Sequence, residues 1–198
     1  MKYVITVGRE YGSGGHFIAK LLAERLGISF YDNELLLKIS ESSNLSHDVI
    51  TQYDEKKEGL FSSGINLYSS DLSLGSKVFL AQFDKIKEIA ENESCVIVGR
   101  CADYILKNHP HLVNVFITAP MDEKINRAVK YYGLDPAKAE KIINKKNKKR
   151  KEYYMYYTNK DWGSAQSYDI CINSKIGIEE CVNCLEAYVK ARFNLNNE

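Results

Sequence analysis

The chain of 198 residues lacks any uninterrupted apolar run of membrane-spanning length, and residues 1–7 are too short to form a signal-peptide core. It also lacks internal repeats and low-complexity tracts. Because 44% of its residues are apolar and 27% are charged, the composition excludes a disordered or fibrous chain. We therefore expect one soluble, cytoplasmic domain that spans residues 1–198 and has no membrane partner.

The five cysteines do not make a recognisable metal or disulfide framework. Cys181 and Cys184 form a C-x-x-C pair, but no second cysteine pair or close histidine pair supplies the other ligands of a zinc site. An odd number of cysteines outside a secretory context argues against disulfides. We predict no metal site, and buried thiols on strands and a helix for Cys95, Cys101, Cys171, Cys181 and Cys184.

The chain has little net charge, only +1, but its charged residues are segregated along the sequence. Residues 138–160 carry nine basic and two acidic side chains, a local charge of +7 that leaves −6 for the remainder. Such a block indicates a phosphate-binding arm, a nucleic-acid patch or a solvated helix face. Because Arg binds phosphate in a bidentate manner better than Lys does, Arg150 is the strongest candidate within it, ahead of Lys146 and Lys149.

Short apolar strands alternate with amphipathic helices along the chain, which predicts an α/β domain with a mainly parallel sheet covered on both faces. Two segments depart from this alternation, at about 42–73 and about 135–165, and we interpret them as excursions from the domain. The expected strands are 3–7, 28–31, 95–98, 112–118 and 170–172. The expected helices are 16–26, 34–40, 74–92, 121–132, one that opens at Asp135-Pro136, and 178–193.

A glycine-rich segment, residues 8–15, joins the first strand to the first helix, where parallel sheets often bind phosphate. It is not the standard G-x-x-x-x-G-K-[ST] loop, because Gly15 stands at the lysine position and His16 at the Ser/Thr position. It is not G-x-G-x-x-G either, because Phe17 occupies the third glycine position. A merely tight turn is the alternative. If the loop binds phosphate, Arg9 is the best substitute for the missing lysine.

Motifs along the whole chain resemble the cytidylate kinase-like family, whose loop reads R-E-Y-G-S-G-G and lacks the lysine. They are Val7–Gly15, Phe30–Leu35, Ile97–Tyr104, Phe116–Pro120 with Arg127, Tyr153-Tyr154 through Lys160–Gly163, and Tyr168–Ile170 with Ile172-Asn173. The resemblance implies a three-layer P-loop kinase fold, with a five-stranded parallel sheet, helices on both faces and a helical lid. The two excursions lie where this family has its acceptor-binding segment and its lid.

The resemblance also implies an ATP-dependent phosphotransferase that uses Mg²⁺ and acts on a nucleoside monophosphate, CMP-like, or on a similar small phosphorylated acceptor. The implied catalytic residues are Arg9, Arg127 and Arg150, and the donor-binding residues are Gly12, Ser13, Gly14, Gly15 and His16. The implied acceptor-binding residues are Asp32, Glu34, Arg100 and Asp103. True cytidylate kinases read G-R-D-I-G-T where this chain has Gly99–Tyr104, so the carboxylate of Asp103 is displaced by two residues. Asp32 is the more plausible carboxylate of the pocket or of a metal shell.

Two other functions remain open. The missing lysine also suits a nucleotide- or phosphometabolite-binding protein that has lost turnover. The basic segment with its neighbouring tyrosines suits a nucleic-acid binder, which we rank last. The sequence does not predict an oligomeric state.

Overall fold

The computed structural model describes residues 1–32 and 82–195 of the chain. Within these ranges five strands form one sheet in the order β2-β3-β1-β4-β5, and all neighbouring strands run parallel. The predicted α/β fold with a five-stranded parallel sheet is therefore confirmed. The strands are β1 (Val4–Arg9), β2 (Ser29–Tyr31), β3 (Cys95–Val98), β4 (Leu112–Thr118) and β5 (Ile170–Asn173).

The central strand β1 is longer than the sequence predicts. It continues past Val7 to Arg9 because it stays paired with β4 through Arg9 and Ile117. Val4, Ile5 and Val7 are almost completely buried, as expected for a strand with neighbours on both sides and helices on both faces. Arg9 consequently leaves the sheet at its carboxyl edge.

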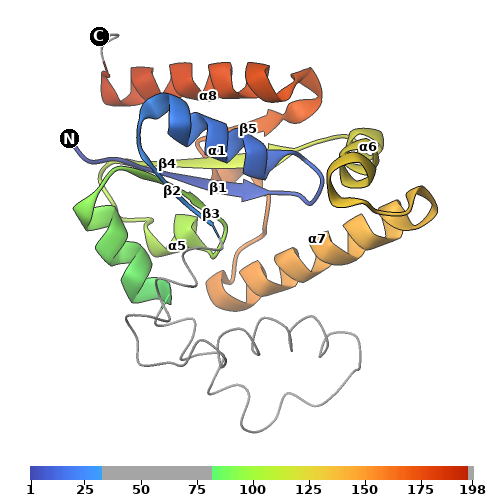
Figure 1. The fold of residues 1–198 in the computed structure, drawn as a ribbon. Helices are drawn as coiled ribbons and strands as arrows, with labels where there is room; N and C mark the ends of the chain where they lie inside the picture. Colours follow the sequence, from blue (N-terminus) through green and yellow to red (C-terminus); the bar gives the residue numbers. More distant parts are fainter. Residues whose placement is uncertain (33–81, 196–198) are drawn as a thin grey trace, which may run out of the picture.

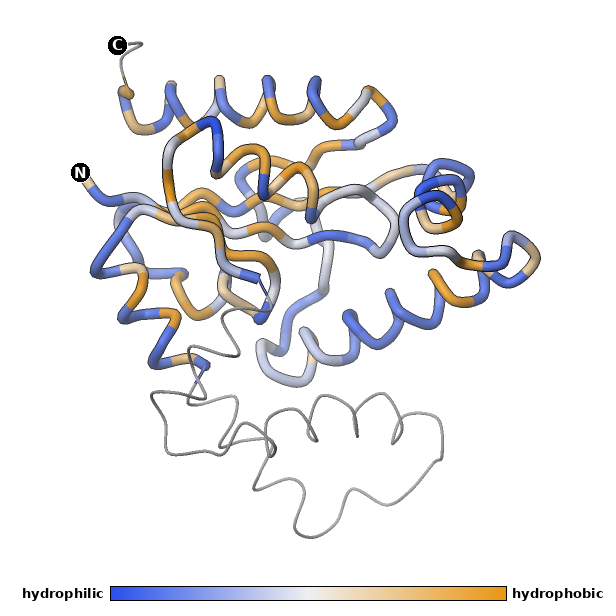
Figure 2. The backbone as a smooth tube through the Cα atoms, viewed as in Figure 1, coloured by the Kyte–Doolittle hydropathy of each residue, from blue (hydrophilic) through white to orange (hydrophobic). Residues whose placement is uncertain are grey.

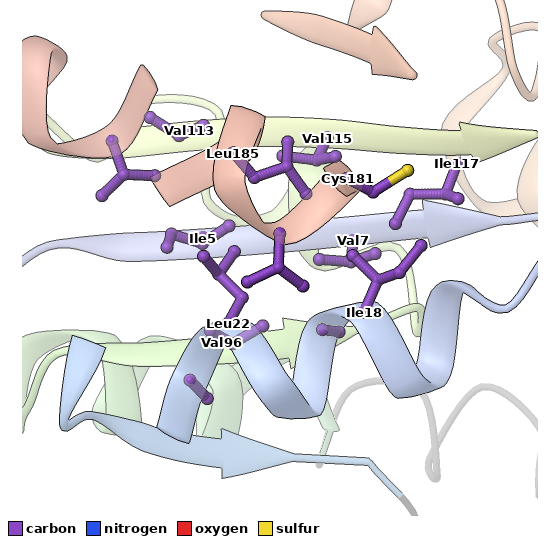
Figure 3. Packing of buried hydrophobic residues seen from close by; sticks show 14 of the residues in the cluster. Ile5, Val7, Ile18, Leu22, Val96, Val113, Val115, Ile117, Cys181 and Leu185 are labelled. Atoms are coloured by element: carbon purple, nitrogen blue, oxygen red, sulfur yellow. The ribbon is translucent and has the colours of Figure 1, made fainter. Parts of the chain in front are cut away.

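Two layers of helices cover the sheet (Figure 1). Helices α1 (Gly15–Leu26) and α8 (Ile178–Phe193) lie on one face, and α5 (Ala102–Ile105) and the helical residues 82–92 lie on the other. Figure 3 shows Ile18 and Leu22 of α1 and Leu185 of α8 packed against the sheet. Each fully buried side chain of this size contributes about 1.5 to 3 kcal/mol, so this core holds α1 in a fixed position on the sheet.

The remaining helices gather beyond the carboxyl ends of the strands (Figure 1). They are α6 (Met121–Tyr132) and α7 (Pro136–Thr158), with 3-10 turns at Ala165–Ser167 and Ser174–Ile176. Asp135 caps α7 by accepting from the Ala137 N–H at 3.0 Å, as its Asp-Pro start predicts. Most of α7 is hydrophilic (Figure 2). Because α7 contains most of the basic segment, its position brings these basic side chains to the edge of the sheet where β1 ends at Arg9.

The expectation that all five thiols are buried is wrong for two of them. Cys95, Cys101 and Cys181 are buried, but Cys171 and Cys184 are exposed. Cys171 lies on β5, which is the last strand of the sheet and has exposed positions alternating with buried ones. Apolar neighbours in sequence therefore do not bury Cys171 at this edge.

Some sequence expectations fall outside the described residues: the helix at 34–40, the start of the helix at 74–92, the excursion at 42–73, and Glu34. Within residues 1–32 and 82–195, no helix is both long and apolar enough to cross a membrane. The second excursion, 135–165, contains α7, and the role of α7 as a lid stays a prediction.

Candidate functional site

The glycine-rich loop is folded around a buried serine. The Ser13 hydroxyl donates to the Glu10 carbonyl oxygen at 2.8 Å and accepts from the Gly15 N–H at 3.3 Å. Gly12 has a φ of 81°, and a Cβ there would lie 2.7 Å from the carbonyl oxygen of Lys124. Position 12 thus needs glycine both for its backbone conformation and for the close contact with α6.

The loop ends at the amino terminus of α1 and presents free backbone donors there. Gly14, with a φ of 77°, occupies the N-cap position and supplies no side-chain cap. Among the partners that the described residues offer, none accepts a hydrogen bond from the N–H groups of Gly12, Gly14 or His16. Unpaired N–H groups at a helix amino terminus favour an anion, so the loop has the donors that a phosphate-binding turn requires.

Glu10 connects the loop to the neighbouring β4–α6 turn through hydrogen bonds and an ion pair. Its Oε2 atom accepts from the Thr118 hydroxyl at 2.6 Å, the Ala119 N–H at 3.3 Å and the Lys124 ammonium at 3.1 Å. Lys124 is 7% exposed, so this ion pair is shielded from water. The sequence analysis missed Glu10, because its three partners lie more than 100 residues away.

Arg9 extends across the loop toward the end of β3. A Cβ on Gly15 would lie 2.5 Å from the Arg9 Cβ, and a Cβ on Gly99 would lie 2.3 Å from the Arg9 Nη1. The two glycines therefore leave room for the arginine side chain. Burial, followed by the positive charge of Arg150, lowers the pKa of Arg9 to about 9, against an opposing effect of Asp32. In the described part of the chain no hydrogen-bond acceptor or ion-pair partner faces the Arg9 guanidinium.

Helix α7 docks directly on the loop. Arg150 donates from Nη1 to the Arg9 carbonyl oxygen at 2.8 Å, and Asn147 Oδ1 accepts from the Tyr11 N–H at 2.7 Å. Lys146 Nζ lies 5.0 Å and the Arg150 guanidinium 5.6 Å from the centroid of the Tyr11 ring. Burial lowers the pKa of Arg150, and the nearby Tyr132, Tyr11 and Asp32 oppose that effect. Tyr11 and Asn147 are site residues that the sequence analysis did not identify.

His16 pairs with Asp32, which follows β2. The distance from His16 Nε2 to Asp32 Oδ2 is 2.8 Å, and the side chains are 41% and 20% exposed. The His16 ring also makes edge contacts with Phe17 and Phe30. The structure thus brings together two residues that the sequence analysis assigned to different ligands, His16 to the donor and Asp32 to the acceptor.

These residues do not fit a magnesium ion held by the loop. Mg²⁺ prefers oxygen ligands, but an imidazole that already contacts a carboxylate stands at the usual Ser/Thr position. The Ser13 hydroxyl is occupied by Glu10 and Gly15. In the ranges that the structure describes, no three His, Cys, Asp or Glu side chains are grouped so as to hold a metal. The metal-shell role of Asp32 stays a prediction.

Arg127 lies behind the loop. It donates from Nη1 to the Ser174 hydroxyl at 2.9 Å and to the Ser13 carbonyl oxygen at 3.4 Å, and from Nη2 to the Ser174 carbonyl oxygen at 2.8 Å. It also pairs with Glu123 at 3.3 Å. Its donors thus connect the loop to the turn after β5, away from Arg9.

The segment after β3 carries the last two predicted residues. Gly99, Arg100 and Cys101 all have positive φ, at 79°, 55° and 55°, a costly arrangement for the two residues with side chains. Arg100 is close enough to lower the pKa of Arg9. Asp103 instead accepts from the Tyr154 hydroxyl of α7 at 2.6 Å, and burial raises its pKa. Arg100 thus lies close enough to Arg9 to affect its charge, whereas Asp103 is hydrogen-bonded to Tyr154 near the carboxyl end of α7.

Comparisons with known proteins identify a family and a similar solved structure. A model of the cytidylate kinase-like family matches residues 4–176. An uncharacterized protein from Eubacterium ventriosum ATCC 27560 is 31% identical, with a TM-score of 0.74 over 96% of this chain and 99% of that chain. A search of curated protein sequences finds no match.

More distant solved structures share the fold. A shikimate kinase from Bacteroides thetaiotaomicron is 18% identical, with a TM-score of 0.57 over 95% of this chain and 98% of its own. A gluconokinase from Sinorhizobium meliloti 1021 is 16% identical, with a TM-score of 0.57 over 98% of this chain and 95% of its own. The family model matches residues 4–176, which run from β1 to the turn after β5 and make up most of the chain. The chain therefore belongs to the cytidylate kinase-like family.

Proposed function

We propose that the chain is an ATP-dependent phosphotransferase that acts on a nucleoside monophosphate, CMP-like, or on a similar small phosphorylated acceptor. One observation carries the proposal: Arg150 donates to the Arg9 carbonyl oxygen, and its charge acts on the Arg9 guanidinium. Both lie beside a loop with N–H groups that have no acceptor among the described residues. Burial lowers the pKa of both arginines, so an anion that joins them is stabilised. Membership of the family supports ATP as the donor, generally with Mg²⁺.

On the donor side, residues Gly12 to His16 cradle the phosphates with backbone N–H groups, and Arg9 takes the place of the loop lysine. Phosphoryl transfer needs mainly positioning and charge neutralisation from the protein. Arg150 supplies a second cation from α7, which acts as the lid. Because Arg150 and Asn147 both bind the loop backbone, closing the lid also orders the loop.

On the acceptor side, Asp32 and Arg100 lie at the ends of β2 and β3, next to the arginines. Arg100 binds the acceptor's anionic group, and Asp32 orients the acceptor within a set of three guanidinium groups. Glu34 lies outside the described residues, and its role in acceptor binding stays a prediction. Asp103, being hydrogen-bonded to Tyr154, acts by fixing α7 relative to β3.

Arg127 has a supporting role in this proposal. Its guanidinium donates to the Ser13 carbonyl and to Ser174. It therefore fixes the shape of the cradle and aligns the N–H groups of the loop. We expect its removal to loosen the loop rather than to remove a direct phosphate contact.

Incubation of the purified chain with ATP, with and without MgCl₂, and each of CMP, dCMP, UMP, AMP and GMP tests the proposal. The readouts are ADP release and formation of the nucleoside diphosphate. We expect turnover with at least one pyrimidine monophosphate, and a loss of about 100-fold in kcat in Arg150→Ala. Absence of nucleoside diphosphate with every acceptor would contradict the proposal.

A binding protein without turnover is the second candidate, favoured by one observation. The imidazole of His16 is paired with Asp32 at the position where active loops carry a hydroxyl group. Calorimetry distinguishes the two functions: micromolar ATP binding with no ADP formed over hours supports the binding protein.

A further inference from the structure

This site differs from a standard loop in the groups that would neutralise the charge of a bound triphosphate. In a standard loop, one lysine and one Mg²⁺ supply three positive charges, and the Ser/Thr hydroxyl and a carboxylate help to hold the metal. Here glycine occupies the lysine position and histidine the hydroxyl position. Both of the loop's usual sources of positive charge are therefore changed.

The oxygen-bearing side chains around the loop that could ligate a metal already bind other parts of the protein. His16 Nε2 lies 2.8 Å from Asp32 Oδ2, so the nearest carboxylate is paired with an imidazole. The Ser13 hydroxyl is buried and bonded to Glu10 and Gly15. A Glu10 oxygen accepts from Thr118, Ala119 and Lys124 on the far side of the loop.

Arginines restore the missing charge. Arg150 Nη1 donates to the Arg9 carbonyl oxygen at 2.8 Å, and the charge of Arg150 lowers the pKa of Arg9, so these two positive charges lie together at the end of β1. Guanidinium groups are always available as donors near neutral pH and bind phosphate oxygens in pairs. Arg9 has room to do so because position 99 is glycine.

From this arrangement, we infer that the site binds the donor triphosphate as a metal-free polyanion, with Arg9 and Arg150 in place of the loop lysine and the protein-held Mg²⁺. The inference rests on the proposed function, since it concerns the same donor site. It predicts that Mg²⁺ adds little to nucleotide affinity. It also predicts that His16 and Asp32 keep the metal from being held by the loop.

Isothermal titration of the full chain with AMP-PNP, in 1 mM EDTA and in 5 mM MgCl₂, tests the inference. We expect dissociation constants that differ by less than about threefold between the two buffers. Arg150→Met should weaken binding in EDTA by about tenfold or more, because it removes one of the two cations at the donor site. His16→Thr restores a hydroxyl and releases Asp32, so Mg²⁺ should strengthen AMP-PNP binding to this variant by about tenfold.

The matched control is His109→Thr, which makes the same change just before β4, at the amino end of that strand. It should bind AMP-PNP like the natural chain in both buffers. Tighter wild-type binding in MgCl₂, by tenfold or more, would overturn the inference while leaving the proposed function intact. No binding in either buffer would remove the proposed function as well. If His16→Thr does not fold, the comparison of the two buffers with the natural chain decides the question alone.

Discussion

The side-chain stem of Arg9 fills the space next to Gly15, since a Cβ on Gly15 would lie 2.5 Å from the Cβ and 3.1 Å from the Cγ of Arg9. A side chain of any kind at position 15 would therefore overlap the Arg9 stem in this loop. The Arg9 stem thus occupies the space that a side chain at position 15 would need, which supports the proposal that Arg9 replaces the missing cation.

Gly15→Lys should therefore not restore a standard loop. The new side chain overlaps a buried stem, so we expect a loss of about 1 to 3 kcal/mol in the free energy of unfolding, measured with urea. Gly27→Ala is the control, because nothing lies within 4 Å of its Cβ position, although its φ of 63° costs about 1 kcal/mol. Equal stability of Gly15→Lys and the natural chain would contradict the assignment.

Arg9→Met should stabilise the protein at neutral pH while weakening the binding of phosphate compounds. The substitution removes a partly desolvated charge that faces Arg150 and Arg100, and we expect a gain of about 1 to 2 kcal/mol. Asp32 and Tyr132 are the groups that partly offset this cost in the natural chain. Chemical denaturation of both proteins at pH 7.5 measures the gain.

The gain should shrink at high pH. Folding lowers the pKa of Arg9 to about 9, so above pH 9 the unfolded chain binds more protons than the folded chain. The natural chain then loses the cost of its buried charge, and its stability approaches that of Arg9→Met. We expect a smaller gap at pH 10 than at pH 7.5. For the exposed Arg192→Met, the stability difference from the natural chain should be the same at both pH values. If the difference for Arg9→Met is also the same at both, Arg9 does not carry a buried charge that destabilises the fold.

Arg127 and Arg150 should separate stability from activity. Arg127→Met leaves the Ser13 and Ser174 oxygens without a charged donor and should cost about 2 to 3 kcal/mol in the free energy of unfolding. Arg150→Met should stay within about 1 kcal/mol of the natural chain and lose about 100-fold in kcat. Urea melts and ADP release measure the two effects. The reverse pattern would interchange the two roles.

Tyr154→Phe should destabilise the base of α7 in a pH-dependent way. The Tyr154 hydroxyl donates to buried Asp103 and opposes the rise of its pKa that burial causes. Without that donor the folded-state pKa of Asp103 rises further, so the loss is present above this pKa and shrinks as Asp103 becomes protonated. We expect about 1 to 3 kcal/mol at pH 7.5 and less at pH 5. The exposed Tyr156→Phe should change stability at neither pH.

Much of the fold follows from local sequence patterns. The apolar residues of β1, β3 and β4 and the Asp-Pro start of α7 need only neighbouring residues to be interpreted. The glycine-rich turn and its position after β1 place the site. Cys171 shows the limit of this approach, because exposure on β5 depends on strand order in the sheet.

The partners within the site depend on contacts between distant segments. Asn147 and Tyr11 are 136 residues apart, and Arg150 reaches the Arg9 carbonyl across 141 residues. No local pattern predicts such pairs. His16 with Asp32 is similar: each residue was a candidate separately, and only the packing of α1 beside β2 brings them into contact.

The binding of ATP to the natural chain and to Arg9→Met, followed by calorimetry at pH 7.5, tests the central claim most directly. If Arg9 holds the donor phosphates, the natural chain binds ATP in the micromolar range. Arg9→Met then binds ATP about 100-fold more weakly, although its melting temperature is equal or higher. If Arg9→Met binds ATP as tightly as the natural chain, Arg9 does not replace the loop lysine.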